Sequence, residues 1–115
     1  MANTFKRKVS QSLGTTALTD GSTAVGSYTV PAATTATIIG LLCSNRTTTD
    51  ITVDIGHYTG SVLTYLVKDA PVQTGSTMIA VGGTQKLVLE PGDSIRVRSN
   101  IASSVDVIMS ILEIT

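Results

Sequence analysis

The sequence predicts an all-β fold: a single antiparallel β-sandwich, jelly-roll-like, with about eight strands and an N-terminal arm. Three observations predict it. Apolar residues recur with a period of two, as in half-buried strands, and helical spacing never persists. Turns rich in glycine and proline separate the apolar runs. The chain has 115 residues, a length that fits one domain.

Residues 1–13 are polar and basic, so we expect an arm outside the sandwich and a β-sandwich domain over residues 14–115. The run 37–44 is apolar on both faces, which predicts a strand in the centre of a sheet. The apolar phase of the last strand shifts near Ile111, which predicts a bulge or a strand covered on both sides. The expected strands lie near 15–19, 26–30, 36–44, 51–58, 62–68, 77–81, 85–89 with 94–99, and 104–114.

Two turns have recognisable chemistry. Gly82 and Gly83 can both take positive φ, which predicts a two-residue hairpin between 78–81 and 85–89. Glu90-Pro91-Gly92-Asp93 places proline second and glycine third, as a type II turn requires. The run 87–95 also resembles the Pro-Gly-Asp turn of cupins, but the histidines that hold a metal in that family have no counterpart here. The resemblance favours a jelly-roll-like corner without the cupin metal site.

Composition narrows the classes of function. Hydrophobic residues make up 42% of the chain and charged residues only 14%, and the formal net charge is +0. Ordinary domains carry about 25% charged residues. A neutral chain predicts no specific nucleic-acid binding. Low surface charge leaves little repulsion between copies, which is typical of a subunit packed among others.

The sequence offers no convincing catalytic or metal-binding set. His57 is the only histidine, and a catalytic reading would combine it with Asp54 or Asp69 and with Ser61. Nothing in the spacing singles out this trio, so we expect a hydrogen-bonded histidine at a strand end. Cys43 is the only cysteine and lies in an apolar run, as a buried packing residue would.

One histidine and one cysteine cannot build a tetrahedral protein site for a metal. Asp50 and Asp54 could hold calcium, but their strand spacing favours solvated acids on a strand face. We therefore predict no enzyme activity, no cofactor and no metal. The sequence also contains neither an apolar signal segment nor a run long enough to span a membrane, so no membrane partner is expected.

Several phrases, in their order along the chain, resemble small virion structural proteins of tailed phages, especially marine cyanobacterial phages. They are Ser27–Ala32, Thr37–Leu41, Tyr65–Pro71, Gln85–Asp93 and the C-terminal Ser104–Thr115. The resemblance runs from about Thr15 onward. It implies a β-sandwich or jelly roll that is present in many copies on the virion, without saying where. The lack of a signal segment predicts that the protein is made in the host cytoplasm.

The leading hypothesis is a capsid decoration, or cement, protein that binds the major capsid protein or other virion proteins and forms homo-oligomeric contacts within the particle. The expected partner-binding residues are in the arm: Phe5 and Val9 as apolar anchors, and Lys6, Arg7 and Lys8 against acidic patches. The alternative is a neck or tail subunit, such as a collar, fibre-base or tube-associated protein.

A further alternative is a carbohydrate-binding adhesin. Sugar sites usually present an aromatic platform, and aromatic residues total only 3% of the chain. Besides Phe5, the candidates are Tyr28, Tyr58 and Tyr65.

Overall fold

The computed structural model describes residues 3–82, 84 and 86–115. It is the all-β sandwich that the sequence predicts, and the described helices are two short 3-10 turns, η1 (Gly21–Thr23) and η2 (Val25–Ser27). The strands are β1 (Asn3–Leu13), β2 (Thr35–Asn45), β3 (Ile51–Tyr58), β4 (Leu63–Val72), β5 (Thr77–Val81), β6 (Leu87–Leu89), β7 (Ser94–Ser99) and β8 (Val105–Ile114).

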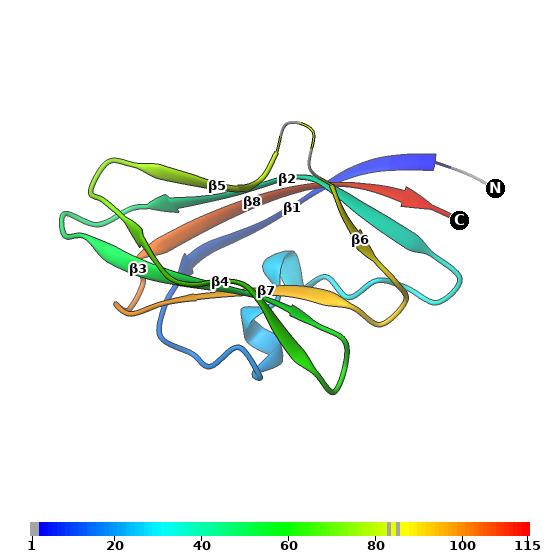
Figure 1. Cartoon of the computed structure of the whole chain (residues 1–115), viewed down its shortest axis with the longest axis horizontal. Coiled ribbons are helices and arrows are strands. Elements are labelled where there is room, and N and C mark those ends of the chain that lie inside the picture. Colours follow the sequence, from blue (N-terminus) through cyan, green and yellow to red (C-terminus); the bar gives the residue numbers. More distant parts are fainter. Residues whose placement is uncertain (1–2, 83, 85) are drawn as a thin grey trace.

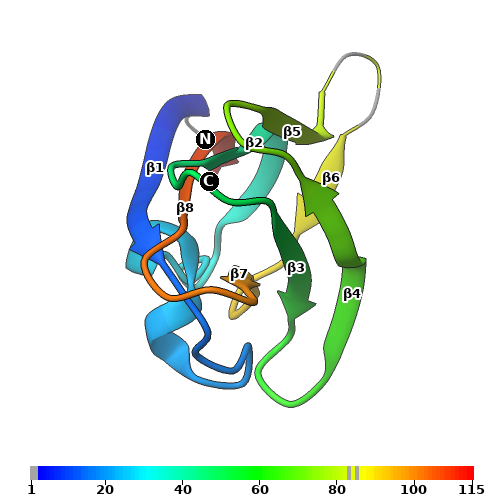
Figure 2. The same ribbon diagram turned by 90° about the vertical axis from the view of Figure 1, so that its left-hand side faces the viewer.

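Two antiparallel sheets lie one over the other (Figures 1 and 2). The five-stranded sheet has the order β1-β8-β2, and both β5 and β6 pair with the far side of β2. The three-stranded sheet has the order β4-β3-β7. Beyond β7, Ala24 makes one antiparallel bridge to Arg96. With the Ala24 segment in the place of a strand beside β7, the order is that of a jelly roll.

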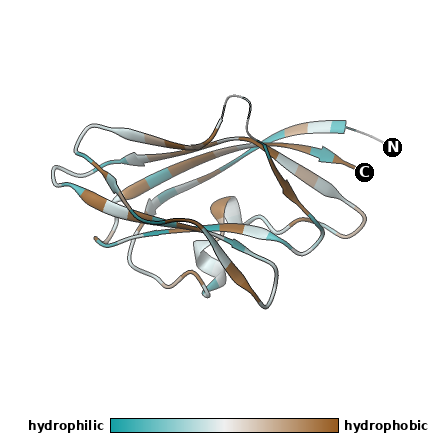
Figure 3. Ribbon diagram, in the orientation of Figure 1, coloured by the Kyte–Doolittle hydropathy of each residue, from teal (hydrophilic) through white to brown (hydrophobic). Residues whose placement is uncertain are grey.

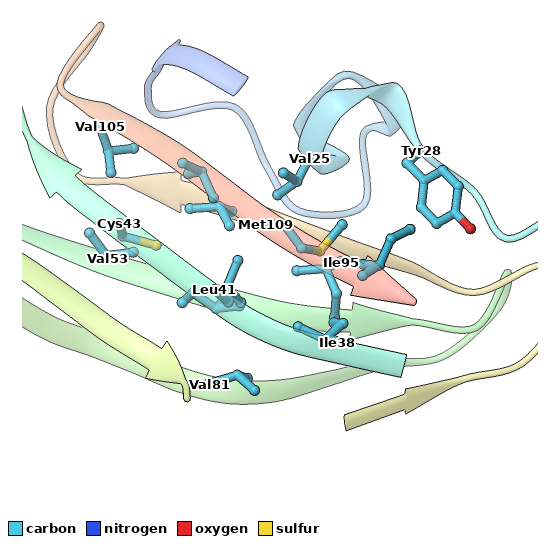
Figure 4. Packing of buried hydrophobic residues seen from close by; sticks show 14 of the residues in the cluster. Val25, Tyr28, Ile38, Leu41, Cys43, Val53, Val81, Ile95, Val105 and Met109 are labelled. Carbon is cyan, nitrogen blue, oxygen red and sulfur yellow. The ribbon is translucent and has the colours of Figure 1, made fainter. Parts of the chain in front are cut away.

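The core lies between the sheets and is mainly aliphatic (Figure 4). Alternate residues of each strand point into it, and the alternation of brown and paler or teal stretches along the strands reflects this (Figure 3). Leu41 and Cys43 of β2 and Met109 of β8 are fully buried there. Cys43 is a free, buried cysteine, as predicted, and burial raises the pKa of its thiol to about 12. A thiol with so high a pKa serves packing and is a poor nucleophile.

The predicted arm outside the sandwich is wrong for the described part of residues 1–13. Asn3–Leu13 is β1, an edge strand paired with β8 from Asn3–Ile114 to Leu13–Val105. The main-chain hydrogen bonds of this ladder satisfy the backbone of a segment that has few apolar residues of its own. The domain therefore includes residues 3–13, and the expected boundary at 14 does not separate an arm from the sandwich.

The strands predicted near 15–19 and 26–30 are also wrong. Residues 14–34 instead form loops and the turns η1 and η2, and Asp20 caps η1 by accepting a hydrogen bond from the Ser22 amide at 2.9 Å. Buried side chains such as Leu18 and Val25 still pack inward from this segment. These side chains fill the core from loops and turns, without strand pairing. Because buried apolar residues also occur in strands, their presence here led to the prediction of two strands.

The predicted hairpin at Gly82-Gly83 includes Gly83, which lies outside the described residues. Its two expected arms do not form a hairpin, because β5 and β6 each run antiparallel to β2 and so run in the same direction. They are successive parts of one edge, separated by residues 82–86. The burial of Val81 and Leu89 against the core outweighs the local preference for a tight turn.

The turn at Glu90–Asp93 is confirmed. The Asp93 amide donates to the Glu90 carbonyl at 3.0 Å, and Gly92 has a φ of 90°, as the third position of a type II turn requires. The turn returns the chain into β7.

The apolar shift in the last strand has a different cause from the one predicted. Burial alternates without interruption along β8, and Glu113 takes an inward position while Leu112 faces outward. The bulge at this point belongs to the partner strand, where Ile39 of β2 is the extra residue between Ile38 and Gly40.

Candidate protein-docking face

The outward side of the five-stranded sheet carries two rows of mostly apolar side chains that cross the sheet from β1 to β5 and β6. The first row is Phe5, Leu112, Thr37 and Val88, and the second row is Val9, Ile108, Leu42 and Ile79. Residues directly opposite in an antiparallel pair lie about 4.5–5.5 Å apart, so each row is continuous. We call these residues, with Arg7 and Ser110 between the rows, the outer face.

The outer face is exposed as well as apolar. The exposed fractions are 73% for Phe5, 67% for Ile79, 55% for Val88 and 49% for both Val9 and Ile108. These are five of the seven large hydrophobic side chains that are exposed among the described residues. Scattered exposed aliphatics are ordinary on proteins, but a contiguous group marks a surface that contacts another molecule.

Sequence reasoning missed most of this face. It used the run 37–44 only to place β2 centrally, which is correct, because β2 has neighbours on both sides. The aliphatic side chains of such a run that point outward do not pack in the core and remain on the surface of the sheet. The missed signal was that β8 has the same double apolar character around Ile108 and Leu112, so two adjacent strands present aliphatics to the outside.

The five predicted partner-binding residues divide between two sides of β1. Phe5, Arg7 and Val9 point outward and lie on the outer face, because they pair with the outward residues of β8. Lys6 and Lys8 point the other way. The strand period of two makes this division unavoidable once residues 3–13 are a strand.

Lys6 and Lys8 are engaged within the chain. The Lys6 Nζ lies 2.8 Å from Oε1 of Glu113, whose side chain is buried, and the Lys8 Nζ lies 4.9 Å from the centre of the Tyr28 ring. The Tyr28 hydroxyl donates a hydrogen bond to Oε2 of Glu113. These contacts pin β1 to the rim of the sandwich and explain why a basic segment is a strand.

The pinning contacts shift two pKa values. Hydrogen bonds from Lys6 and Tyr28 lower the pKa of Glu113, against the opposing effect of burial. Burial, and then the bond to Glu113, raises the pKa of Tyr28. Glu113 is therefore charged and Tyr28 neutral near neutral pH.

Replacing Glu113 with glutamine is expected to loosen β1 specifically. The substitution removes the charge that holds Lys6, so the amides of β1 should exchange with deuterium at least several-fold faster, while β3 amides keep their rates. Because folding lowers the pKa of Glu113, its stabilising effect is full above the ordinary value near 4.5 and is lost as pH falls. Wild-type β1 should therefore also exchange faster in acid, after correction for intrinsic rates. Glu90→Gln, in an exposed turn, is the matched control. Equal β1 protection in both variants would contradict the pinning role.

The outward side of the three-stranded sheet is polar and internally paired. Asp54 is buried, which corrects the prediction of a solvated acid on a strand face. Its Oδ1 accepts a hydrogen bond from the Asp69 amide at 2.7 Å, and its Oδ2 lies 3.2 Å from Nη1 of Arg98 and 3.7 Å from Nζ of Lys68. Burial acts to raise the pKa of Asp54, but these partners outweigh burial and the pKa is lowered.

His57 is the hydrogen-bonded strand-end histidine that the sequence predicts. Its Nε2 lies 2.8 Å from Oδ2 of Asp93, and the same oxygen accepts the Glu90 amide at 3.0 Å. His57 and Asp54 point to opposite sides of β3, since they are three residues apart in a strand. The proposed trio with Asp54 is not assembled, and Asp93 orders a turn.

The remaining surface offers little for a small ligand. Two shallow hollows line the seam between β4 and the β5–β6 edge, with volumes of about 410 and 320 Å³. Aliphatic residues such as Leu66 and Val67 line the larger one. Within residues 3–82, 84 and 86–115, no three acid, histidine or cysteine side chains gather as a metal site.

The tyrosines do not form a shared platform. Tyr28 is buried, the Arg96 guanidinium covers the Tyr58 ring at 3.9 Å, and Tyr65 lies with Lys68 at 5.3 Å. No single aromatic surface for a sugar ring results. Of the helical turns that are described, neither has the length or apolarity to cross a bilayer.

Comparison with known proteins assigns this chain to no family. The sequence matches no protein-family model, and no curated protein shows significant similarity to it.

Proposed function

We propose that this chain is a structural protein of a tailed-phage virion, and specifically a decoration protein that binds the major capsid protein and stabilises the head. The observation that carries the proposal is the outer face: two mostly apolar rows on one side of a β-sheet, with five large hydrophobic side chains exposed. The sequence phrases, in their order along the chain, resemble those of tailed-phage virion proteins. This resemblance is the reason for proposing a tailed-phage particle.

The outer face suits docking to a broad protein surface. The sheet fixes the backbone of the outer face, and its valine and isoleucine side chains are restricted at χ1, so covering them costs less conformational entropy than ordering a flexible segment. Burying an exposed aliphatic or aromatic side chain contributes about 1.5–3 kcal/mol. Several such side chains can offset the loss of translational freedom on binding, estimated at about 4–15 kcal/mol. Binding, without chemistry, is the use that this arrangement supports.

The docking role predicts a selective defect. The double variant Ile79→Thr with Ile108→Thr keeps β-branched residues in both strands and removes apolar surface from the second row. We expect at least tenfold weaker binding to particles stripped of the native protein, with an unchanged fold by circular dichroism. Val62→Thr alters an exposed aliphatic between β3 and β4 and is the matched control. Equal binding by both variants would reject this face as the docking site.

Copy number tests the place on the particle. Quantitative mass spectrometry of purified particles of the phage that encodes the chain should find it in hundreds of copies if it decorates the head. A ring of about six or twelve copies would instead favour the neck or tail alternative. Absence from purified particles would reject the virion role altogether.

A further inference from the structure

We infer that the outer face binds a different protein, one whose surface places a carboxylate against Arg7 between two apolar strips, and that it does not bind a second copy of this chain. The inference rests on the proposed function, since it specifies the partner of the same face. Its basis is the position and isolation of one cation.

Arg7 lies midway between the two rows, on the edge strand β1 of the outer face. It follows Phe5 and precedes Val9 on the same side of β1, about 7 Å from each along the strand. Across the sheet its row continues with Ser110 and Gly40, which are small. The Arg7 side chain is exposed, and in the described part of the chain no ion pair or hydrogen bond involves it.

The neighbouring cations differ from Arg7. Lys6 is paired with Glu113, and Lys8 lies over the Tyr28 ring. The nearest acid on the outward side, Asp106, already accepts the Ser12 amide at 2.8 Å and lies 3.2 Å from Nη1 of Arg46. The outer face therefore has one positive charge, at its β1 edge, and no carboxylate of its own among the described residues.

A partner that covers both apolar rows would also cover Arg7, which lies between them on β1. Removing a guanidinium from water without a partner is unfavourable, whereas a carboxylate restores the lost interactions through two parallel hydrogen bonds. A complementary partner must thus combine apolar side chains with an acid that lies against the β1 edge. A protein surface can provide both features, whereas a purely apolar surface cannot provide the carboxylate.

A second copy offers no free acid for this contact, because the described residues of its outer face include no carboxylate and the neighbouring Asp106 is already engaged by Arg46 and the Ser12 amide. In the aligned class of sheet packing, strands stay within about 30° of each other, and a symmetric pair of this class can have its axis across or along the strands. An axis across the strands through the middle row stacks Arg7 on Arg7. An axis along the strands stacks β1 over β5 and β6, whose described outward residues are Thr77, Ile79 and Val88. In these two arrangements no carboxylate among the described outward residues lies over Arg7.

The test combines charge variants with chemical crosslinking on particles stripped of the native protein. Arg7→Glu is expected to weaken binding at least tenfold and Arg7→Lys to retain most of it. Gln73→Glu, an exposed position in the β4–β5 turn, controls for added negative charge. A carbodiimide, which couples amines to carboxylates, should join the lysine of Arg7→Lys to an aspartate or glutamate of a different protein, identified by mass spectrometry.

Three results would overturn the inference, and they are distinguishable. Unchanged binding of Arg7→Glu to particles that wild type binds would refute the role of Arg7 and leave the decoration role intact. Crosslinking of residue 7 to an acid of a second copy would identify self-association instead. A wild-type chain that binds no particle would reject the proposed function and this inference with it.

Discussion

Leu41→Ala is expected to lower the free energy of unfolding by about 2–5 kcal/mol, the range for removing a buried leucine side chain. Leu41 is fully buried between the sheets, with β8 on one side of its strand and β5 on the other. The cavity left behind cannot collapse easily, because both neighbours are held by main-chain ladders. Urea unfolding followed by circular dichroism measures the change.

The adjacent residue gives the control. Leu42 has the same side chain on the next position of the same strand but points to the outer face, where it is only partly covered. Leu42→Ala should change stability by less than about 1 kcal/mol and weaken particle binding instead. If both variants lose similar stability, the assignment of the two faces of β2 is wrong.

Asp54→Ala is expected to destabilise the fold by about 2–4 kcal/mol at neutral pH, because it leaves Arg98 and the Asp69 amide without their carboxylate partner. The partial exposure of Arg98 keeps the expected loss below that of a fully buried ion pair. Comparison of urea midpoints for wild type and variant measures it.

The effect of Asp54 should depend on pH in a stated direction. Burial acts to raise the pKa of Asp54. The Asp69 amide, Arg98 and Lys68 together lower it by more than burial raises it, so the folded pKa lies below the ordinary 3.8. The stabilising effect is therefore full above pH 3.8 and is lost as pH falls through the folded pKa. The difference between wild type and Asp54→Ala should shrink in acid. Asp69→Asn is the control, since Asp69 is exposed and asparagine tolerates its φ of 53°. A loss from Asp69→Asn as large as that from Asp54→Ala would contradict this account.

Particular residues show how far sequence reasoning could reach toward the candidate site. It selected Phe5, Arg7 and Val9 from local composition, and the structure places them on one face with Ile108 and Ile79. Lys6 and Lys8 were grouped with these residues because the sequence predicted a flexible arm, in which side chains have no fixed inward or outward orientation. Recognising a strand would have separated the two sets, since alternation alone assigns them to opposite sides.

By itself, the sequence determined the class of the fold, the strands from 36 onward, the Glu90–Asp93 turn and the buried place of Cys43, because alternation and turn chemistry act over a few residues. Only the tertiary structure decided that Asn3–Leu13 pairs with β8, that β5 and β6 share one edge, and that Asp54 is buried. The β1–β8 ladder pairs residues 3–13 with residues 105–114, and nothing local in either segment specifies its partner. The outer face exists only because that long-range pairing aligns the aliphatics of separate strands.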